Sequence, residues 1–273
     1  LHMEREFEMI RVCPLFSGSS GNSVYIEFSN RKGILVDAGR STKQIENILS
    51  ENNIDICNID SVFVTHEHND HISALKVLTS KHKFKVYGSE GTIGSIRKKN
   101  IIFDGKLCNI LKKNETDLEF ISVKTFSISH DCCDGFGYVF TDKSGEKIAI
   151  CTDLGYISNE VKDALIGCNT VILESNHDVM MLQNGPYPYY LKRRILSDSG
   201  HLSNETSGKF LPFLVNNGTK NIILSHLSSH NNVPALAIQT SVYYLNSEGI
   251  NVGSDVSLEV APKENHKLVD LRI

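Results

Sequence analysis

The chain reads Thr65-His66-Glu67-His68-Asn69-Asp70-His71 directly after the apolar run Val62-Phe63-Val64. The apolar run predicts a strand, and side chains alternate along a strand, so His66 and His68 are expected on the same side of its end. The turn into the next helix can aim Asp70 and His71 at a neighbouring point. The spacing therefore predicts ligands for two metal ions rather than one.

Three later residues can complete this site, because each lies at or just past the end of a predicted strand. They are His130 after 125–129, Asp153 after 148–152 and His226 after 222–225. A carboxylate can bridge two cations, and imidazole with carboxylate suits zinc, manganese or iron better than magnesium or calcium. Each residue alone would be an ordinary polar group at a strand end. Together with the first cluster they predict a dinuclear site at a cleft.

Short apolar segments alternate with helical patterns and hairpins along the chain, which predicts an α/β fold. Strands are expected at residues 10–16, 23–28, 33–36, 61–65, 83–86, 118–128, 137–141, 147–151, 170–174 and 221–224. Helices are expected at 42–50, 71–79, 92–98, 159–165, 204–214 and 233–245.

Length and composition favour one hydrolase domain. With 273 residues and 40% hydrophobic content the chain can bury a large core, so residues 9–273 are expected to form a single domain. Residues 1–8 are interpreted as a tag remnant or a disordered N-terminus. No apolar run approaches the roughly 20 residues that span a bilayer, and no signal-peptide pattern precedes the first strand. The chain is therefore expected in the cytoplasm, without a membrane partner.

The cysteines fit the same compartment. Seven cysteines, an odd number without a CxxC pair, argue against a secreted disulfide framework. Cys132 and Cys133 follow His130, but adjacent cysteines rarely bind one ion well. They are expected to act as thiols rather than as metal ligands.

The order of these motifs, HxHxDH followed by a single His, an Asp and a last His, resembles the metallo-β-lactamase superfamily from Met9 to about Leu245. The resemblance implies an αββα sandwich, in which two mixed β-sheets pack face to face between helices with the metals at the rim. It implies two divalent ions, with Zn²⁺ favoured and Mn²⁺ or Fe²⁺/Fe³⁺ as alternatives. By the same resemblance, one ion is held by His66, His68 and His130, the other by Asp70, His71 and His226, and Asp153 bridges them.

Such a pair of ions predicts metal-assisted hydrolysis. Two cations about 3.5–4 Å apart lower the pKa of a bridging water and stabilise charge on the attacked group. Asp70 is both an expected ligand and the group best placed to orient that water. Asp37, after another apolar strand, can hold a ligand His through its other ring N–H, or can instead cap the helix that starts near Ser41. Both roles are open for Asp37.

Four further segments resemble the YycJ (WalJ, VicX) branch of the superfamily. They are Ser17-Gly18-Ser19-Ser20-Gly21-Asn22-Ser23, Thr152-Asp153-Leu154-Gly155, Glu174-Ser175-Asn176-His177-Asp178 and Gly200-His201-Leu202-Ser203-Asn204. This resemblance implies a 5′-to-3′ DNA exonuclease connected with mismatch repair, with a 5′-phosphorylated DNA end as substrate and an unidentified repair protein as a possible partner. In related nucleases and phosphodiesterases a similar Gly-His-Ser/Thr element handles the scissile phosphate.

The same segments supply candidates for substrate binding. Ser20 and Asn22 belong to a run of small residues that lets a phosphate approach closely, although a plain hairpin connection explains the glycines as well. His201 precedes Ser203, an expected helix N-cap, and a helix N-terminus favours an anion. His201 can therefore bind the phosphate or protonate the leaving oxygen, and the alternative is a surface His beside a cap. The remaining substrate-binding candidates are Asn176, Ser203 and Asn204.

Supporting roles are expected for three more residues. Glu174 is a catalytic candidate, because it can form a proton relay with His201 or with His177. His177 and His230 are expected to support the ligands rather than to bind metal themselves.

The segment Tyr187-Pro188-Tyr189-Tyr190-Leu191-Lys192-Arg193-Arg194 interleaves aromatic rings with cations, as a nucleic-acid track requires. An amphipathic helix with its tyrosines packed inward is an equally good interpretation. The net charge of −4 and pI near 6.3 argue against non-specific coating of DNA. Any contact with DNA must then use a local basic patch and the metals.

Two other function classes compete with a phosphodiesterase. A small-molecule thioesterase or lactonase, similar to glyoxalase II, would use the same metal motif. A non-catalytic metal-binding regulator is disfavoured, because every ligand position is filled.

Overall fold

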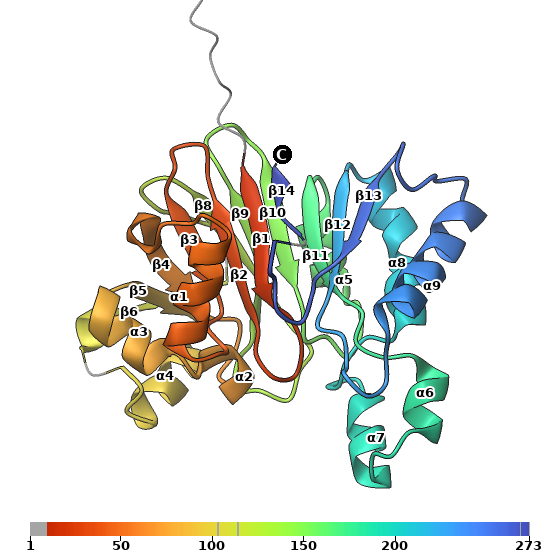
Figure 1. Ribbon diagram of the computed structural model, residues 1–273, viewed down its shortest axis with the longest axis horizontal. Coiled ribbons are helices and arrows are strands. Elements are labelled where there is room, and N and C mark those ends of the chain that lie inside the picture. The colour runs from red at the N-terminus through yellow and green to blue at the C-terminus, as the bar shows by residue number, and fades with distance from the viewer. Residues whose placement is uncertain (1–9, 103, 114, 268, 273) are drawn as a thin grey trace, which may run out of the picture.

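Two mixed β-sheets pack face to face in the computed structural model, which describes residues 10–102, 104–113, 115–267 and 269–272 (Figure 1). The strands of the first sheet, in spatial order, are β14 (Leu271–Arg272), β1 (Arg11–Phe16), β2 (Ser23–Glu27), β3 (Gly33–Val36), β4 (Ile59–Phe63), β5 (Lys85–Gly88) and β6 (Cys108–Ile110). Those of the second are β13 (Ser257–Val260), β12 (Asn221–Ser225), β11 (Thr170–Glu174), β10 (Lys147–Cys151), β9 (Phe136–Thr141), β8 (Ser122–Ser127) and β7 (Glu115–Asp117).

Each sheet changes from antiparallel to parallel pairing along its width. In the first sheet β1 to β3 are antiparallel and β3 to β6 are parallel. In the second sheet β7 to β10 are antiparallel and β10 to β13 are parallel. Parallel strands need crossover connections, and helices provide them here.

The helices are α1 (Thr42–Glu51), α2 (Asn69–Ile72), α3 (Leu75–His82), α4 (Glu90–Lys98), α5 (Asn159–Leu165), α6 (Val179–Asn184), α7 (Tyr189–Ile195), α8 (Asn204–Asn216) and α9 (Pro234–Ser247). Residues of α1, α3 and α4 pack on the outer face of the first sheet, and those of α5, α8 and α9 on the outer face of the second. A third apolar cluster fills the space between the sheets. Its centre is aromatic, with the Phe63 ring 5.6 Å from Tyr138 and 5.0 Å from Phe140. The predicted αββα sandwich is confirmed.

Side-chain caps fix where several helices begin. Ser41 accepts a hydrogen bond from the Gln44 N–H, and the Gln44 side chain returns to the Ser41 N–H, which is a capping box. Ser203 accepts from the Thr206 N–H at the start of α8, which confirms the predicted cap. These caps place the helix starts next to the strand ends that carry the candidate site residues.

The expected strands and helices are all present, with ends shifted by a few residues. The helix expected at 71–79 is divided into α2 and α3, because the Ala74 N–H donates to the Ala38 carbonyl, outside the helix. Strands β6, β7, β13 and β14 and helix α6 are additional to the prediction, while α7 falls in the segment 187–194, for which a helix was one of two interpretations. The predicted tag remnant or disordered stretch at 1–8 lies outside the described residues.

Within the part of the chain that the structure describes, no helix is long and apolar enough to cross a membrane. All seven cysteines are free thiols.

Candidate metal centre

The predicted metal ligands meet at one edge of the molecule, where strands of both sheets end. The segment from His66 to His71 follows β4 of the first sheet, and His130, Asp153 and His226 follow β8, β10 and β12 of the second. Neighbouring parallel strands end at the same edge of a sheet, so β10 and β12 carry their last residues to one place. Five of the predicted ligands border a cleft of about 260 Å³, namely His68, Asp70, His130, Asp153 and His226, and its other lining residues are Ser19, Asn176, Tyr187, Leu191, Arg194, Ile195, His201 and Ser228.

One group of possible ligands consists of His66, His68 and His130. Their ligand atoms all lie within 4.8 Å of one another. His66 Nε2 and His68 Nδ1 are 3.0 Å apart, and His68 occupies the N-cap position of α2 without using its ring as the cap. His130 Nδ1 donates to the Gly200 carbonyl at 3.2 Å, which leaves its Nε2 for a cation.

A second group consists of Asp70, His71 and His226, again with ligand atoms within 4.8 Å of one another. His71 Nδ1 donates to Asp37 at 2.8 Å, while His71 Nε2 lies 3.6 Å from Asp70 Oδ2. His226 Nδ1 donates to Glu174 at 2.7 Å. In both imidazoles a carboxylate holds one ring nitrogen, so that the other can face a cation.

Asp153 lies between the two groups. Its Oδ2 is 3.6 Å from His71 Nε2, and its Oδ1 is 3.3 Å from His226 Nδ1 and 3.9 Å from His130 Nε2. Asp153 also joins His66 and His71 in a third compact group. Its backbone adopts the left-handed conformation, with φ of 61°, which few residues other than Gly, Asn and Asp adopt readily.

These residues fit a pair of cations. Asp153 Oδ2 and His226 Nε2 are buried without a hydrogen-bond partner among the residues that the structure describes. A buried polar atom without a partner costs about 1–3 kcal/mol, so these two atoms are suited to bind a cation. Their donor types, imidazole nitrogen and carboxylate oxygen, suit divalent transition metals.

Asp37 supports His71 rather than capping a helix. One oxygen of its carboxylate accepts from the Thr65 N–H and the other from the Thr65 hydroxyl, each at 2.8 Å, in addition to His71. The cap of α1 is Ser41. Of the two roles that the sequence left open, the structure therefore gives Asp37 the support of a candidate ligand.

The Ser17–Ser23 loop contacts the same part of the site. Asn22 Nδ2 lies 3.1 Å from His71 Nε2, and the Asn22 N–H donates to the Asp70 carbonyl. Gly39 is needed here, because a Cβ atom on it would lie 1.6 Å from Asp70 O. Ser20 is exposed and does not line the cleft, whereas its neighbour Ser19 does.

Glu174 joins two histidines at the floor of the cleft. Its Oε1 accepts from His201 Nδ1 at 2.8 Å and from His226 Nδ1 at 2.7 Å. Burial alone would raise the pKa of Glu174, but the charges and hydrogen bonds of the two histidines outweigh it and lower the pKa to about 2. Of the two histidines considered as partners of Glu174, His201 is therefore the one bonded to it, and His201 also lines the cleft.

His177 and His230 are not brought to the cleft wall. His177 is buried with both ring nitrogens unpartnered among the described residues, and burial lowers its pKa to about 4. His230 is exposed, with its Nδ1 3.2 Å from the Tyr187 hydroxyl.

The remaining substrate-binding candidates divide into two sets. Asn176 lines the cleft, with its Nδ2 bonded to the His226 carbonyl at 2.8 Å. Ser203 and Asn204 do not line it, because the Ser203 hydroxyl caps α8 and the Asn204 side chain is buried in hydrogen bonds with Ser175 and Asn232.

The aromatic and basic segment forms one wall of the cleft through α7. Tyr189 and Tyr190 are 76% and 74% exposed, so the alternative of a helix with inward tyrosines is wrong. Arg194 reaches the cleft and binds both carboxylate oxygens of Asp131, at 2.5 and 2.7 Å. Asp131 was not singled out from the sequence, since only the fold brings it to Arg194.

The adjacent cysteines lie apart from the possible ligand groups. Neither Cys132 nor Cys133 belongs to any group of metal-binding side chains found among the described residues. Burial raises the pKa of Cys132 to about 12, so its thiol stays protonated near neutral pH.

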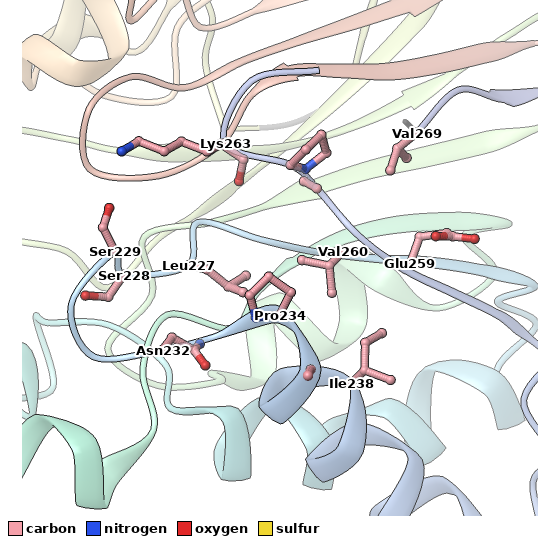
Figure 2. Close-up of a pocket in the computed structure, with 14 residues that line it drawn as sticks. Leu227, Ser228, Ser229, Asn232, Pro234, Ile238, Glu259, Val260, Lys263 and Val269 are labelled. Atoms are coloured by element: carbon pink, nitrogen blue, oxygen red, sulfur yellow. The ribbon is translucent and has the colours of Figure 1, made fainter. Parts of the chain in front are cut away.

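A second, larger hollow of about 760 Å³ is lined by residues of the loop after β12, of α9 and of the segment 259–263 (Figure 2). Its walls are mostly apolar, from Leu227, Pro234, Ile238 and Val260, and Ser228 borders both spaces. Glu259 and Lys263 are its charged residues among those described. It lacks the histidines and the buried carboxylates that hydrolysis requires, so the smaller cleft is the candidate active site.

Two histidines carry raised pKa values in the metal-free protein. Burial lowers the pKa of His71 and of His226, but Asp37 and Asp153 for the first, and Asp153 and Glu174 for the second, outweigh it. The pKa of His71 rises to about 10 and that of His226 to about 9, from an ordinary 6.5. Both rings are therefore protonated at pH 7 until a cation displaces the protons.

The metal-free protein should lose stability from pH 7 to pH 9. A raised folded-state pKa stabilises the fold fully below the unfolded value of 6.5, and this contribution disappears as the pH rises through about 9 for His226 and about 10 for His71. We expect the melting temperature of EDTA-treated protein to fall by about 5 °C over this range. The zinc-loaded protein should show a smaller fall or a rise, since cations bind neutral imidazole. A metal-free melting temperature that rises between pH 7 and 9 would contradict these proton positions.

The sequence of this chain is similar to a known protein family and to two exodeoxyribonucleases. The sequence profile of the family described as "Beta-lactamase superfamily domain" matches residues 32–227. The exodeoxyribonuclease YycJ of Bacillus anthracis is 39% identical over 241 residues, which are 88% of this chain and 90% of the relative. The exodeoxyribonuclease WalJ of Streptococcus pneumoniae serotype 2 is 38% identical over 244 residues, with the same coverage of 88% and 90%.

A solved structure shares the fold. The metallo-β-lactamase fold protein YhfI from Bacillus subtilis superimposes with a TM-score of 0.71, over 97% of this chain and 100% of that chain. Its sequence identity of 14% shows likeness of fold alone.

Proposed function

The chain belongs to the β-lactamase superfamily and to its YycJ/WalJ branch, and on this premise we propose that it is a metal-dependent phosphodiester hydrolase that acts on DNA as an exonuclease. The observation that carries the proposal is the identity of 38–39% over 88% of the chain to relatives named exodeoxyribonuclease. The gathered ligand groups support it, because they supply the metal chemistry that such hydrolysis uses. A thioesterase or lactonase fits less well, since these relatives are named as nucleases.

We infer that one cation is held by His66, His68 and His130. The other is held by Asp70, His71 and His226, and Asp153 lies between the two groups. Zinc is our first choice, with manganese and iron as alternatives. When bound, two divalent cations supply Lewis acidity and lower the pKa of water.

His201 is our candidate for the proton donor to the leaving oxygen. Its Nδ1 donates to Glu174, so in the imidazolium form, with both ring nitrogens protonated, Nε2 can give its proton to a group in the cleft. It lies just before the N-terminus of α8, where the helix dipole favours a phosphate. Ser19, Asn176 and Arg194 line the same cleft and offer further donors to phosphate oxygens.

The finer properties that we propose are attack from a 5′-phosphorylated end, a role in DNA repair and a cytoplasmic location. Free cysteines fit a reducing compartment. We also infer that residues 9–273 act as one hydrolase domain, because the site takes ligands from the ends of strands in both sheets.

The proposal is tested by digesting internally labelled DNA that carries either a 5′-phosphate or a 5′-hydroxyl. We expect the zinc- or manganese-loaded protein to shorten the 5′-phosphorylated strand progressively from that end, with EDTA slowing the reaction by about 10³-fold or more. An Asp70→Ala protein should be inactive. A panel of thioesters, lactones and lactams is assayed in parallel.

Two outcomes would decide against parts of this function. Intact DNA together with turnover of a small ester would move the enzyme to the thioesterase or lactonase class. Shortening from the 3′ end would keep the exonuclease and overturn the proposed polarity.

A further inference from the structure

Helices α6 and α7 stand apart from the sandwich, below α8 and α9 in Figure 1. The chain leaves the second sheet after Glu174 and forms these two helices. It comes back to the cleft at His201, just before α8. Each helix buries a single residue, Leu182 in α6 and Ile195 in α7. Most residues of these two helices are therefore half-buried or exposed.

The exposed side of α7 carries two tyrosine–arginine pairs. Tyr190 and Arg194 are four residues apart, as are Tyr189 and Arg193, and side chains at this spacing lie on the same face of a helix. The Arg193 guanidinium lies 6.0 Å from the centre of the Tyr189 ring. The two tyrosine rings are about three-quarters exposed, at 76% and 74%.

One of these pairs is continuous with the active-site cleft. Arg194 lines the cleft together with Leu191, and Tyr190 lies one helical turn, about 5.4 Å, further along the same face. The guanidinium uses Nε and Nη2 on Asp131, and a guanidinium has five N–H donors, so others remain for a phosphate.

We propose that α7 is a platform for a single strand of DNA, on which Tyr190 and Tyr189 stack nucleobases while Arg194 and Arg193 contact the phosphates beside them. The proposal rests on the proposed nuclease function, because the strand is the one whose end enters the cleft. Exposed rings that are paired with arginines four residues further along the helix, next to the proposed phosphodiester-cleaving site, match the stacking and charge that single-stranded nucleic acid requires. A protein partner would not require the Tyr190–Arg194 pair to adjoin the active-site cleft.

Binding and catalysis are measured separately. A single-stranded 12-mer with a 5′-phosphate and a 3′-fluorescein is bound to EDTA-treated protein and followed by fluorescence anisotropy. The p-nitrophenyl ester of thymidine 5′-monophosphate, which has only one base, reports the chemistry of the loaded enzyme. The variants are Tyr189→Ala/Tyr190→Ala, Tyr189→Phe/Tyr190→Phe and, as a matched control, Tyr243→Ala, whose ring is 67% exposed on α9.

We expect the double alanine variant to raise the Kd for the 12-mer about tenfold or more, and the KM for its digestion similarly. The double phenylalanine variant, which keeps the rings, and the Tyr243→Ala control should bind as the unchanged protein does. Turnover of the one-base ester should be the same in all four proteins.

Affinity of the double alanine variant within twofold of the unchanged protein would overturn the platform, even if the DNA is digested. Lack of measurable binding by the unchanged protein would overturn it as well. Ring-dependent binding without cleavage of any phosphodiester would leave the platform standing and refute the nuclease function instead.

Discussion

Replacing Asp153 by asparagine is expected to lower kcat by about 10³-fold or more while leaving the fold intact. The carboxylate lies within 4 Å of ring nitrogens in both proposed ligand groups, 3.6 Å from His71 and 3.9 Å from His130. An amide offers one neutral oxygen and cannot bridge two cations. Metal analysis should therefore find about one ion or fewer per chain, against the two that we expect for the unchanged protein.

Asparagine is the informative substitution, because Asp153 has a φ of 61° and asparagine tolerates this left-handed conformation. Alanine would add backbone strain, so that loss of activity could reflect loss of folding. Asp117→Asn, at an exposed position of β7, is the matched control and should change neither kcat nor metal content. An Asp153→Asn protein with two ions and activity within tenfold of the unchanged protein would refute the central role of this carboxylate.

The candidate ligands could be predicted because their signals are local, whereas their division into two groups rests on the family resemblance. The spacing from His66 to His71 needs only the geometry of one strand end and one turn, and the later positions also follow apolar strands. Residues that join the site by tertiary contact carried no such signal. Asp131 reaches Arg194 across 63 positions of the sequence, and Ser228 lines the cleft only because the loop after β12 folds beside it.

A weak local signal also explains why some elements of the fold were not firmly predicted. The predicted strands at 147–151 and 170–174 are buried and apolar, so composition alone marks them. β6 and β7 are three-residue edge strands with partly exposed side chains, which leave little periodicity to detect. α7 buries only Ile195, so it lacks the apolar stripe of an ordinary surface helix.

Glu174 differs from the proposed ligands, because we expect it to act on the site through His201 and His226. Its Oε1 accepts from His201 and His226, and its Oε2 accepts from the backbone N–H groups of Leu154 and Leu202 at 2.9 and 3.0 Å. It thereby fixes which nitrogen of each imidazole is protonated, and it fastens the loop after β10 to the loop before α8. A carboxylate behind a metal-binding imidazole raises the basicity of the ligand and fixes its orientation.

Glu174→Gln should consequently lower metal affinity by about 10- to 100-fold and kcat by at least as much. The glutamine NH₂ must face either the two imidazole N–H groups or the two backbone N–H groups, and either arrangement leaves buried donors unpaired, at a cost of about 2 kcal/mol in the free energy of unfolding.

Asp142→Asn controls for loss of stability, since Asp142 is also buried and accepts hydrogen bonds from Ser29 and Ser144 far from the cleft. That variant should melt earlier yet keep its metal affinity and kcat. If Glu174→Gln behaves in the same way, Glu174 only holds the loops together. If instead metal affinity and kcat fall while Asp142→Asn keeps both, Glu174 acts on the chemistry by positioning His201 and His226.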